Sequence, residues 1–235
     1  MITATKPFSF AATLTCSNCQ KEYSLSGINT YAVCCEQPLV VEYEYPPGFL
    51  KKTIQLRQNN IWRYAEMLPV IEEKNIVSLG EGMTPIFPLN KLGDQYGFSD
   101  LLIKDESSNP TGSFKARGLS VAVSKAKEFG ITNCIIPTAG NAGGALAAYC
   151  AKANIKCTVV MPTHTPAIFK QECKLYGAEV ILIDGLINDC AKKVMEISSD
   201  ANLAKQLGTN GRNYVKEYFN RNTIATKLLE QLKQL

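Results

Sequence analysis

The segment from Lys104 to Gly118, KDESSNPTGSFKARG, carries the clearest chemistry in this chain. Its first part is crowded with Ser, Asn, Pro, Thr and Gly, which is typical of a loop. A helical pattern follows, with Gly130 as a stop signal and apolar residues at Leu119, Ala122, Val123 and Ala126. Lys115 is therefore predicted at a helix N-terminus, where the helix dipole and partial burial disfavour the charged form of its amine. A neutral amine can form an imine with an aldehyde cofactor, although a lone lysine is more often an ordinary surface residue.

A second segment, Ile135 to Asn141, reads IIPTAGN and is followed by AGGALAAYC. This is the pattern of a buried strand, a turn and a helix of small residues. The backbone N–H groups at the start of such a helix form an anion-binding site.

The elements around these segments alternate. Strands are predicted at 101–104, 134–137, 156–161 and 179–183, and helices at 115–129, 142–153, 166–176 and from about 187, with Thr165 as a cap and Pro166 at the first helical position. Such alternation indicates βαβ units and a parallel sheet. Ligands bind at the C-terminal ends of parallel strands, so we expect the loops 109–115 and 138–143 to meet at one edge.

Four segments together resemble the fold-type II pyridoxal-phosphate (PLP) enzymes, and among these the threonine synthases. They are VSLGEGMTP (77–85), NPTGSFKARG (109–118), TAGNAGGALAAY (138–149) and GAEVILIDGLI (177–187). The resemblance implies an α/β fold, a three-layer αβα parallel sheet of the tryptophan synthase β type. It covers residues 8 to 194 and matches the N-terminal half of the family only, so a truncated domain is expected.

The resemblance also implies roles for residues. Lys115 would hold PLP and move protons at Cα and Cβ of the substrate, Asn141 would bind the phenolic oxygen of the cofactor, and Phe114 and Ser113 would shape the floor beside the lysine. The substrate carboxylate would bind to Thr138, Ala139, Gly140, Asn141, Ala142 and Gly143, and Thr84 belongs to a loop on the substrate side. The implied lyase reaction of threonine biosynthesis converts O-phosphohomoserine and water to threonine and phosphate. Ala116 follows the lysine where some members have Asp, which blurs the substrate assignment.

Residues 1–46 are predicted to form a small β module similar to the zinc-ribbon-like knuckle of many threonine synthases. Cys16 and Cys19 match its first Cys-x2-Cys pair, but only Cys35 matches the second, because Ala32 replaces its partner and Cys34 is adjacent instead. Neighbouring cysteines rarely point to one tetrahedral centre. The alternatives are a zinc site of Cys16, Cys19, Cys34 and Cys35, and a metal-free hairpin with packed thiols.

Residues 47–194 are predicted to be the N-terminal part of the PLP domain, and residues 195–235 a helical tail that resembles the end of GT-B glycosyltransferases. No transferase activity is inferred from it. The join near 194–198 looks like a fusion or a truncated reading frame with a foreign end. The second half of the family, with its phosphate-binding loop, is expected to be missing. Three hypotheses follow: a threonine synthase-like enzyme completed by a partner chain, an inactive remnant, or another fold-type II enzyme such as a serine/threonine dehydratase or cysteine synthase. An open sheet edge predicts homo-oligomers.

Composition excludes several other classes. The chain has 235 residues, 46% of them apolar, and no run that could span a membrane. The pI near 8.5 does not argue for nucleic acid. His164 is the one histidine, in a polar turn, so most Ser/His/Asp and multi-histidine metal schemes are excluded. Nine scattered cysteines and no secretory signal predict reduced thiols in a cytoplasmic protein that acts on a small amino-acid phosphate.

Overall fold

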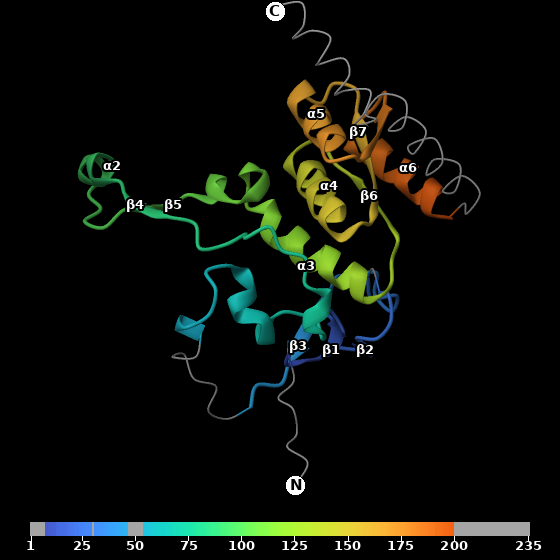
Figure 1. Ribbon diagram of the computed structural model, residues 1–235, viewed down its shortest axis with the longest axis horizontal. Coiled ribbons are helices and arrows are strands. Elements are labelled where there is room, and N and C mark those ends of the chain that lie inside the picture. Colours follow the sequence, from blue (N-terminus) through green and yellow to red (C-terminus); the bar gives the residue numbers. More distant parts are fainter. Residues whose placement is uncertain (1–7, 30, 47–53, 200–235) are drawn as a thin grey trace, which may run out of the picture. The chain divides into compact units, whose positions relative to one another are not determined.

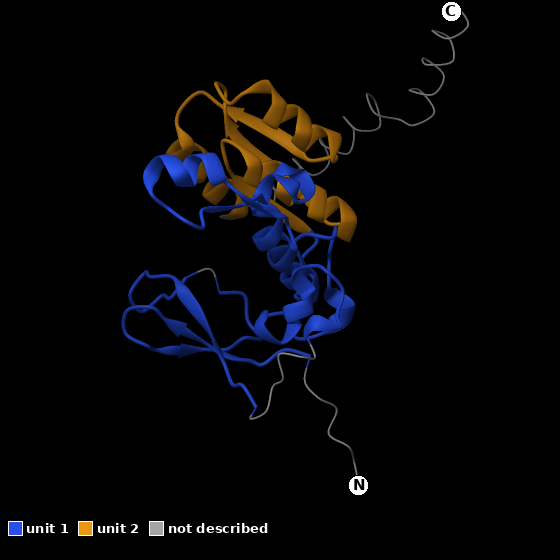
Figure 2. Ribbon diagram, turned by 90° about the vertical axis from the view of Figure 1, so that its left-hand side faces the viewer, with its two compact units in different colours: residues 1–132 blue, residues 133–235 orange. Residues whose placement is uncertain are grey.

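The computed structural model describes residues 8–29, 31–46 and 54–199 (Figure 1). The chain forms two compact units, residues 1–132 and 133–235 (Figure 2). This division differs from the boundaries expected at 46/47 and 194/195, which stay predictions. Each unit is described below by itself.

The predicted N-terminal β module is a three-stranded antiparallel sheet in unit 1. Its strands are β1 (Ala11–Cys16), β2 (Glu22–Tyr23) and β3 (Leu39–Tyr43), in the order β2-β1-β3. The Phe10 amide donates to the Glu66 carbonyl at 2.8 Å, which ties the module to the following segment. The same module contains two turns, at residues 16–20 and 32–37.

Two short 3-10 helices follow, η1 (Ile61–Met67) and η2 (Glu73–Asn75). Asn60 caps η1, since its side chain accepts a hydrogen bond from the Trp62 amide at 3.0 Å. Trp62 is buried, as a core residue of unit 1 should be. Its indole N–H is hydrogen-bonded inside the unit, which removes the cost of burying it.

A separate hairpin in unit 1 contains β4 (Ile86–Pro88), α2 (Asn90–Tyr96) and β5 (Leu102–Lys104). The strand predicted at 101–104 is therefore present, but its expected place in the parallel sheet is wrong. β5 pairs antiparallel with β4, with Phe87 opposite Ile103. The Asp105 amide extends the pairing to the Pro85 carbonyl at 3.0 Å, so this edge of β5 is paired with β4 and the residue before it.

The segment before Lys115 forms η3 (Glu106–Ser108) and η4 (Pro110–Gly112), and then α3 (Lys115–Glu128) begins. The helix ends before Gly130, as predicted. Its predicted apolar stripe is only partly correct, because Ala122 is exposed. Ser120 and Ser124 lie on the buried face instead, where their hydroxyls donate to the carbonyls of Val77 and Ser120 at 2.7 Å.

Unit 2 is a three-layer α/β structure, which confirms the predicted fold class. Its parallel sheet has the order β6-β7-β8. α4 and α5 pack on one face, and α6 packs on the other (Figure 1). Alternation along β7 explains this: Val160 faces Cys190 and Ile197 of α6, whereas Met161 faces α4 and α5. The bounds are β6 Asn133–Pro137, α4 Asn141–Ala153, β7 Lys156–Pro162, α5 Ala167–Leu175, β8 Glu179–Ile183 and α6 Ile187–Ser199.

Two boundaries in unit 2 differ from expectation. α5 begins at Ala167 with Pro166 as its N-cap, so the predicted cap at Thr165 is wrong. Pro166 is extended (ψ 142°), which keeps Thr165 outside the helix. The boundary expected at 194/195 falls inside α6, and residues 200–235 of the predicted tail lie outside the described residues. None of the helices described is long and apolar enough to cross a membrane.

Candidate functional site

Lys115 is the first residue of α3 in unit 1, as the sequence predicts. Its backbone amide donates to the Ser113 hydroxyl at 3.4 Å, and Ser113 is buried. Its Nζ atom lies 4.6 Å from the centroid of the Phe114 ring, which is itself 57% exposed. Ser113, Phe114 and Lys115 are thus brought together, with a partly exposed amine over an aromatic face.

The turn that leads to Lys115 has an unusual backbone. Thr111 has φ 61° and ψ 22°, and Gly112 has φ 64°. A β-branched residue in the left-handed region is an outlier that costs about 1–3 kcal/mol and is often found at functional sites. The Thr111 hydroxyl is buried and has no hydrogen-bond partner in the described part of the chain. A strained turn with an unsatisfied hydroxyl therefore lies four residues before the lysine.

This turn is bonded to the loop that contains Thr84. Arg117 donates to both carboxylate oxygens of Glu106, from Nε at 2.7 Å and from Nη2 at 2.8 Å. Thr84, which is buried, donates its hydroxyl to the same carboxylate at 2.7 Å. Asn109 donates to Glu106 at 2.9 Å and accepts from the Gly82 amide at 3.0 Å. The Arg117 guanidinium is the main reason that the pKa of Glu106 is lowered to about 2, so this carboxylate is ionised at neutral pH.

A second hydrogen-bond network, centred on Glu81, holds the loop that contains Thr84. Glu81 is fully buried and accepts hydrogen bonds from the Trp62 indole at 3.0 Å and from the Ser120 hydroxyl at 2.5 Å. Gly82 has φ 105°, and a Cβ atom there would lie 2.8 Å from the Ile61 amide nitrogen. The loop around Thr84 can therefore take this path only with glycine at position 82.

Sequence reasoning missed Glu81, Glu106 and Arg117 as members of the site. All three stand within the quoted segments, but they have no catalytic residue type or spacing of their own. A charged residue next to a glycine-rich loop is the one signal the sequence offers. Their partners come from distant positions, so only the folded chain identifies them.

The second predicted group, Thr138 to Gly143, lies in unit 2 between β6 and α4. Thr138 is buried, and its hydroxyl accepts from the Gly140 amide at 3.2 Å. Asn141 is exposed at the first position of α4, and no side chain caps this helix. The segment therefore offers exposed backbone and an amide side chain at a helix N-terminus, which suits an anion.

Gly143 is required by packing. A Cβ atom there would lie 2.9 Å from both Met161 Cε and Thr138 Cγ2, and 3.0 Å from Cys173 Sγ. The glycine lets α4 approach the sheet closely and so sets where the turn of Thr138 stands.

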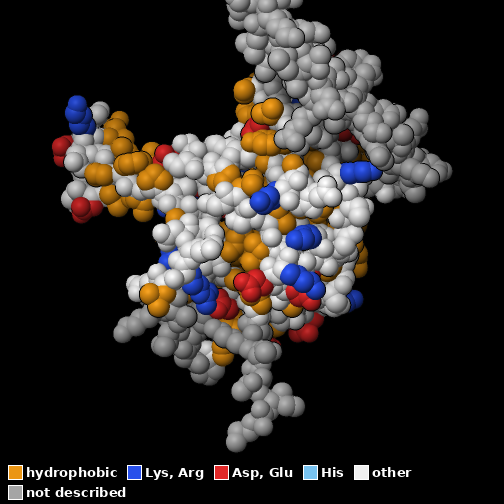
Figure 3. Space-filling view, viewed as in Figure 1, with side chains coloured by type: hydrophobic (Ala, Val, Ile, Leu, Met, Phe, Trp, Pro, Cys, Tyr) orange, Lys and Arg blue, Asp and Glu red, His pale blue; other side chains and the backbone are white. Residues whose placement is uncertain are grey.

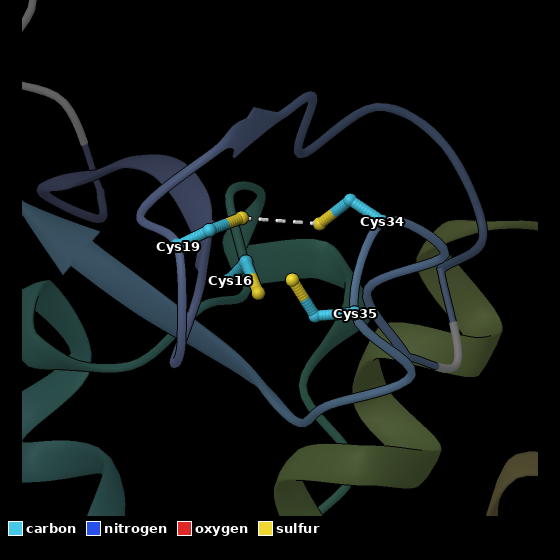
Figure 4. A group of neighbouring side chains, drawn as sticks. All are labelled: Cys16, Cys19, Cys34 and Cys35. Carbon is cyan, nitrogen blue, oxygen red and sulfur yellow. Dashed lines mark hydrogen bonds between the residues drawn. The ribbon is translucent and has the colours of Figure 1, made fainter.

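The four predicted metal ligands converge in the N-terminal module (Figure 4). The Sγ atoms of Cys16, Cys19, Cys34 and Cys35 all lie within 4.8 Å of one another. Cys19 and Cys34 are hydrogen-bonded through sulfur at 3.4 Å. The Cys16 pKa is lowered to about 7, mainly by the Cys19 backbone amide, which favours the thiolate that binds metals.

Two turns of the same design produce this cluster. The Cys16 amide donates to the Lys21 carbonyl, and the Ala32 amide donates to the Gln37 carbonyl. Ala32 thus occupies in the second turn the place that Cys16 has in the first, and Cys34 supplies the sulfur that Ala32 lacks. Neighbouring cysteines rarely point to one centre, yet the sulfur atoms of Cys34 and Cys35, in the turn before Glu36 (φ 52°), both lie within 4.8 Å of those of Cys16 and Cys19.

Unit 1 also contains a hollow of about 690 Å³, which is lined by none of the four cysteines. Its lining includes Trp62, Arg57 and Glu66 but not Lys115. Arg57 and Glu66 form a bidentate ion pair at 2.6 Å, and Arg63 and Glu73 also line the hollow, so its lining carries two charges of each sign. The hollow gives no reason to place a charged ligand there.

Comparison with known proteins decides the family. The family model described as "Pyridoxal-phosphate dependent enzyme" matches residues 77–232. The chain belongs to this family. The resemblance seen in the sequence is thereby confirmed. The match runs to residue 232 and so includes most of the segment 195–235; the foreign origin of that segment stays a prediction.

The curated proteins to which the chain is similar include threonine synthases. That of Methanocaldococcus jannaschii is 36% identical over 189 residues, which is 79% of this chain and 46% of the relative. That of Methanosarcina acetivorans is 35% identical over 79% of this chain and 46% of the relative's length. That of Halalkalibacterium halodurans is 44% identical over 57% of this chain and 38% of the relative's length. The chain spans less than half the length of these relatives.

The residues present fit the family's cofactor. Lys115 has a partly exposed side chain whose amine suits the aldehyde, and the Thr111 hydroxyl, four residues earlier in the chain, is unsatisfied. The uncapped start of α4 and the Asn141 amide offer donors for anionic oxygen atoms. The first group belongs to unit 1 and the second to unit 2.

Proposed function

We propose that this chain serves a threonine synthase-like lyase reaction, in which O-phosphohomoserine and water give threonine and phosphate. The observation that supports it most is Lys115 at the start of α3, after a strained turn with an unsatisfied hydroxyl. The threonine synthases to which the chain is similar support the substrate assignment.

Each residue group has a distinct role in this proposal. PLP, when bound, withdraws electrons from the substrate's Cα and Cβ. Lys115 holds the cofactor covalently and afterwards takes and returns protons at those carbons. Asn141 donates to the phenolic oxygen of the cofactor, and Phe114 and Ser113 form the floor beside the lysine. Thr138 and the backbone amides through Gly143 bind the substrate carboxylate.

The test is covalent capture of the cofactor. The purified full chain is incubated with PLP, reduced with borohydride and digested, and mass spectrometry locates the pyridoxyl group. We expect it on Lys115 in the wild type and its loss in Lys115→Ala. Lys127→Ala, an exposed lysine of the same helix, is the control and should label normally.

Phosphate release from O-phosphohomoserine then tests the substrate, and ammonia release from serine or threonine tests the dehydratase alternative. Labelling without either product would reject the lyase reaction for this chain alone. No label at Lys115 would reject cofactor binding and favour the inactive remnant.

We also propose a structural zinc ion in the N-terminal module, held by Cys16, Cys19, Cys34 and Cys35. The convergence of the four sulfur atoms supports this over the metal-free hairpin. Four thiolates in a tetrahedron are a common structural zinc site. The ion would fix the two turns to each other and has no role in the lyase chemistry.

A further inference from the structure

The contacts around Lys115 point to a role for three residues that the family match does not assign. We infer that Glu106, Arg117 and Thr84 are positioning residues, which hold the NPTG turn (109–112) and the GEGMTP loop (80–85) in the geometry that presents Lys115. The inference rests on the proposed function, since it concerns how the same lysine is presented to its cofactor.

The carboxylate of Glu106 is the hub of this network. It receives Arg117 on both oxygens, Thr84 on one and Asn109 on the other. These donors come from α3, from the GEGMTP loop and from the NPTG turn. One carboxylate therefore ties together the start of α3, the GEGMTP loop and the NPTG turn.

Arg117 makes the connection specific. It lies two residues after Lys115 in the first turn of α3, and its bidentate bonds fix the direction of the helix start relative to η3. A lysine at this position would keep the charge but could not make both parallel bonds.

The strain in the turn explains why such a network is present. Thr111 has φ 61°, a conformation that a β-branched residue would leave if the turn were free, whereas the positive φ of Gly112 costs a glycine little. Asn109 holds the turn from both sides, since its carbonyl accepts from the Gly112 amide at 3.0 Å while its side chain reaches Glu106 and Gly82. The network keeps the strained form, in which the Thr111 hydroxyl stays unsatisfied and Lys115 follows directly.

The test compares Glu106→Gln and Arg117→Lys with Asp105→Asn. Asp105→Asn is a matched change of the adjacent carboxylate, which accepts hydrogen bonds from Ser107 and Ser108 of its own turn. Two readouts are used on the full chain: the PLP concentration that gives half-maximal borohydride labelling of Lys115, and hydrogen exchange of segments 80–85 and 109–114 without PLP. Thermal unfolding is followed in parallel.

We expect Glu106→Gln and Arg117→Lys to raise the half-labelling concentration about tenfold, equivalent to about 1.4 kcal/mol. Exchange in both segments should rise, and Asp105→Asn should match the wild type in both readouts. Unchanged labelling and exchange, or a lower unfolding temperature alone, would overturn the inference.

The exchange readout separates the two proposals. If the wild type takes no label at Lys115, the proposed function fails. Exchange then decides the positioning role by itself: faster exchange in both segments of Glu106→Gln supports it, and wild-type exchange rejects it.

Discussion

The adjacent residues Cys34 and Cys35 decide whether the N-terminal module can bind a metal. Both sulfurs face Cys16 and Cys19, although the sequence offers a complete Cys-x2-Cys pair only once. The place of the missing ligand is taken by Ala32, whose methyl group cannot bind zinc. Cys34 therefore has to contribute, and its amide is held by the Tyr23 hydroxyl at 3.2 Å.

We predict that Cys34→Ser and Cys35→Ser each abolish zinc binding. The wild type should carry about one zinc ion per chain, as expected for a four-cysteine site, and the variants close to none. Cys134→Ser, a half-buried cysteine of unit 2, is the control and should keep the metal. Metal analysis after purification with added zinc is the measurement. A wild type without zinc would support the metal-free hairpin.

Among the elements, α4 depends most on one small residue. Gly143 faces Met161 and Cys173, and it allows the helix to lie close to β7 and α5. Gly118 of α3, in contrast, has open space where its Cβ atom would be. The two glycines are a matched pair that separates the effect of packing from that of helix propensity.

We predict opposite effects of alanine at these positions. Gly143→Ala should destabilise the chain by about 1–3 kcal/mol, because the new methyl group overpacks the space between helix and sheet. Gly118→Ala should stabilise it by about 0.5–1 kcal/mol, because alanine is the better helix former. Denaturant unfolding measures both. Equal effects of the two changes would show that the close approach of α4 is not required.

For the whole molecule, the most conspicuous surface is the hairpin of β4 and β5. All side chains of both strands are exposed, including Ile86, Phe87, Leu102 and Ile103. Figure 3 shows apolar side chains gathered on the part of the molecule that contains this hairpin and α2. Exposed apolar patches and short open strands favour association.

We therefore predict that the chain forms homo-oligomers at micromolar concentration, as measured by light scattering. The double change Ile86→Lys with Leu102→Lys should shift it towards the monomer. Leu175→Lys, which changes a still more exposed leucine of α5, should leave the mass unchanged. A monodisperse wild-type monomer would contradict the prediction.

Local sequence patterns were sufficient to predict the family, the place of Lys115 at a helix start and most elements of unit 2. Glycine-rich turns, helical periodicity and short β-branched runs act within a few residues of each other. β8 and the start of α6 were predicted at their observed residues for this reason. Lys115 at the start of α3 follows from the same local signals.

Only the folded structure shows which strands pair with each other and which side chains contact each other. β5 is a strand both in the prediction and in the structure, but only the structure shows that it pairs with β4 and not with the parallel sheet. Glu106 is one charge among many in the sequence, and folding brings Thr84 and Arg117 to it. The cysteine cluster likewise depends on two turns that a β-sheet holds side by side. Such pairings join residues that are distant in the chain, and no local pattern encodes them.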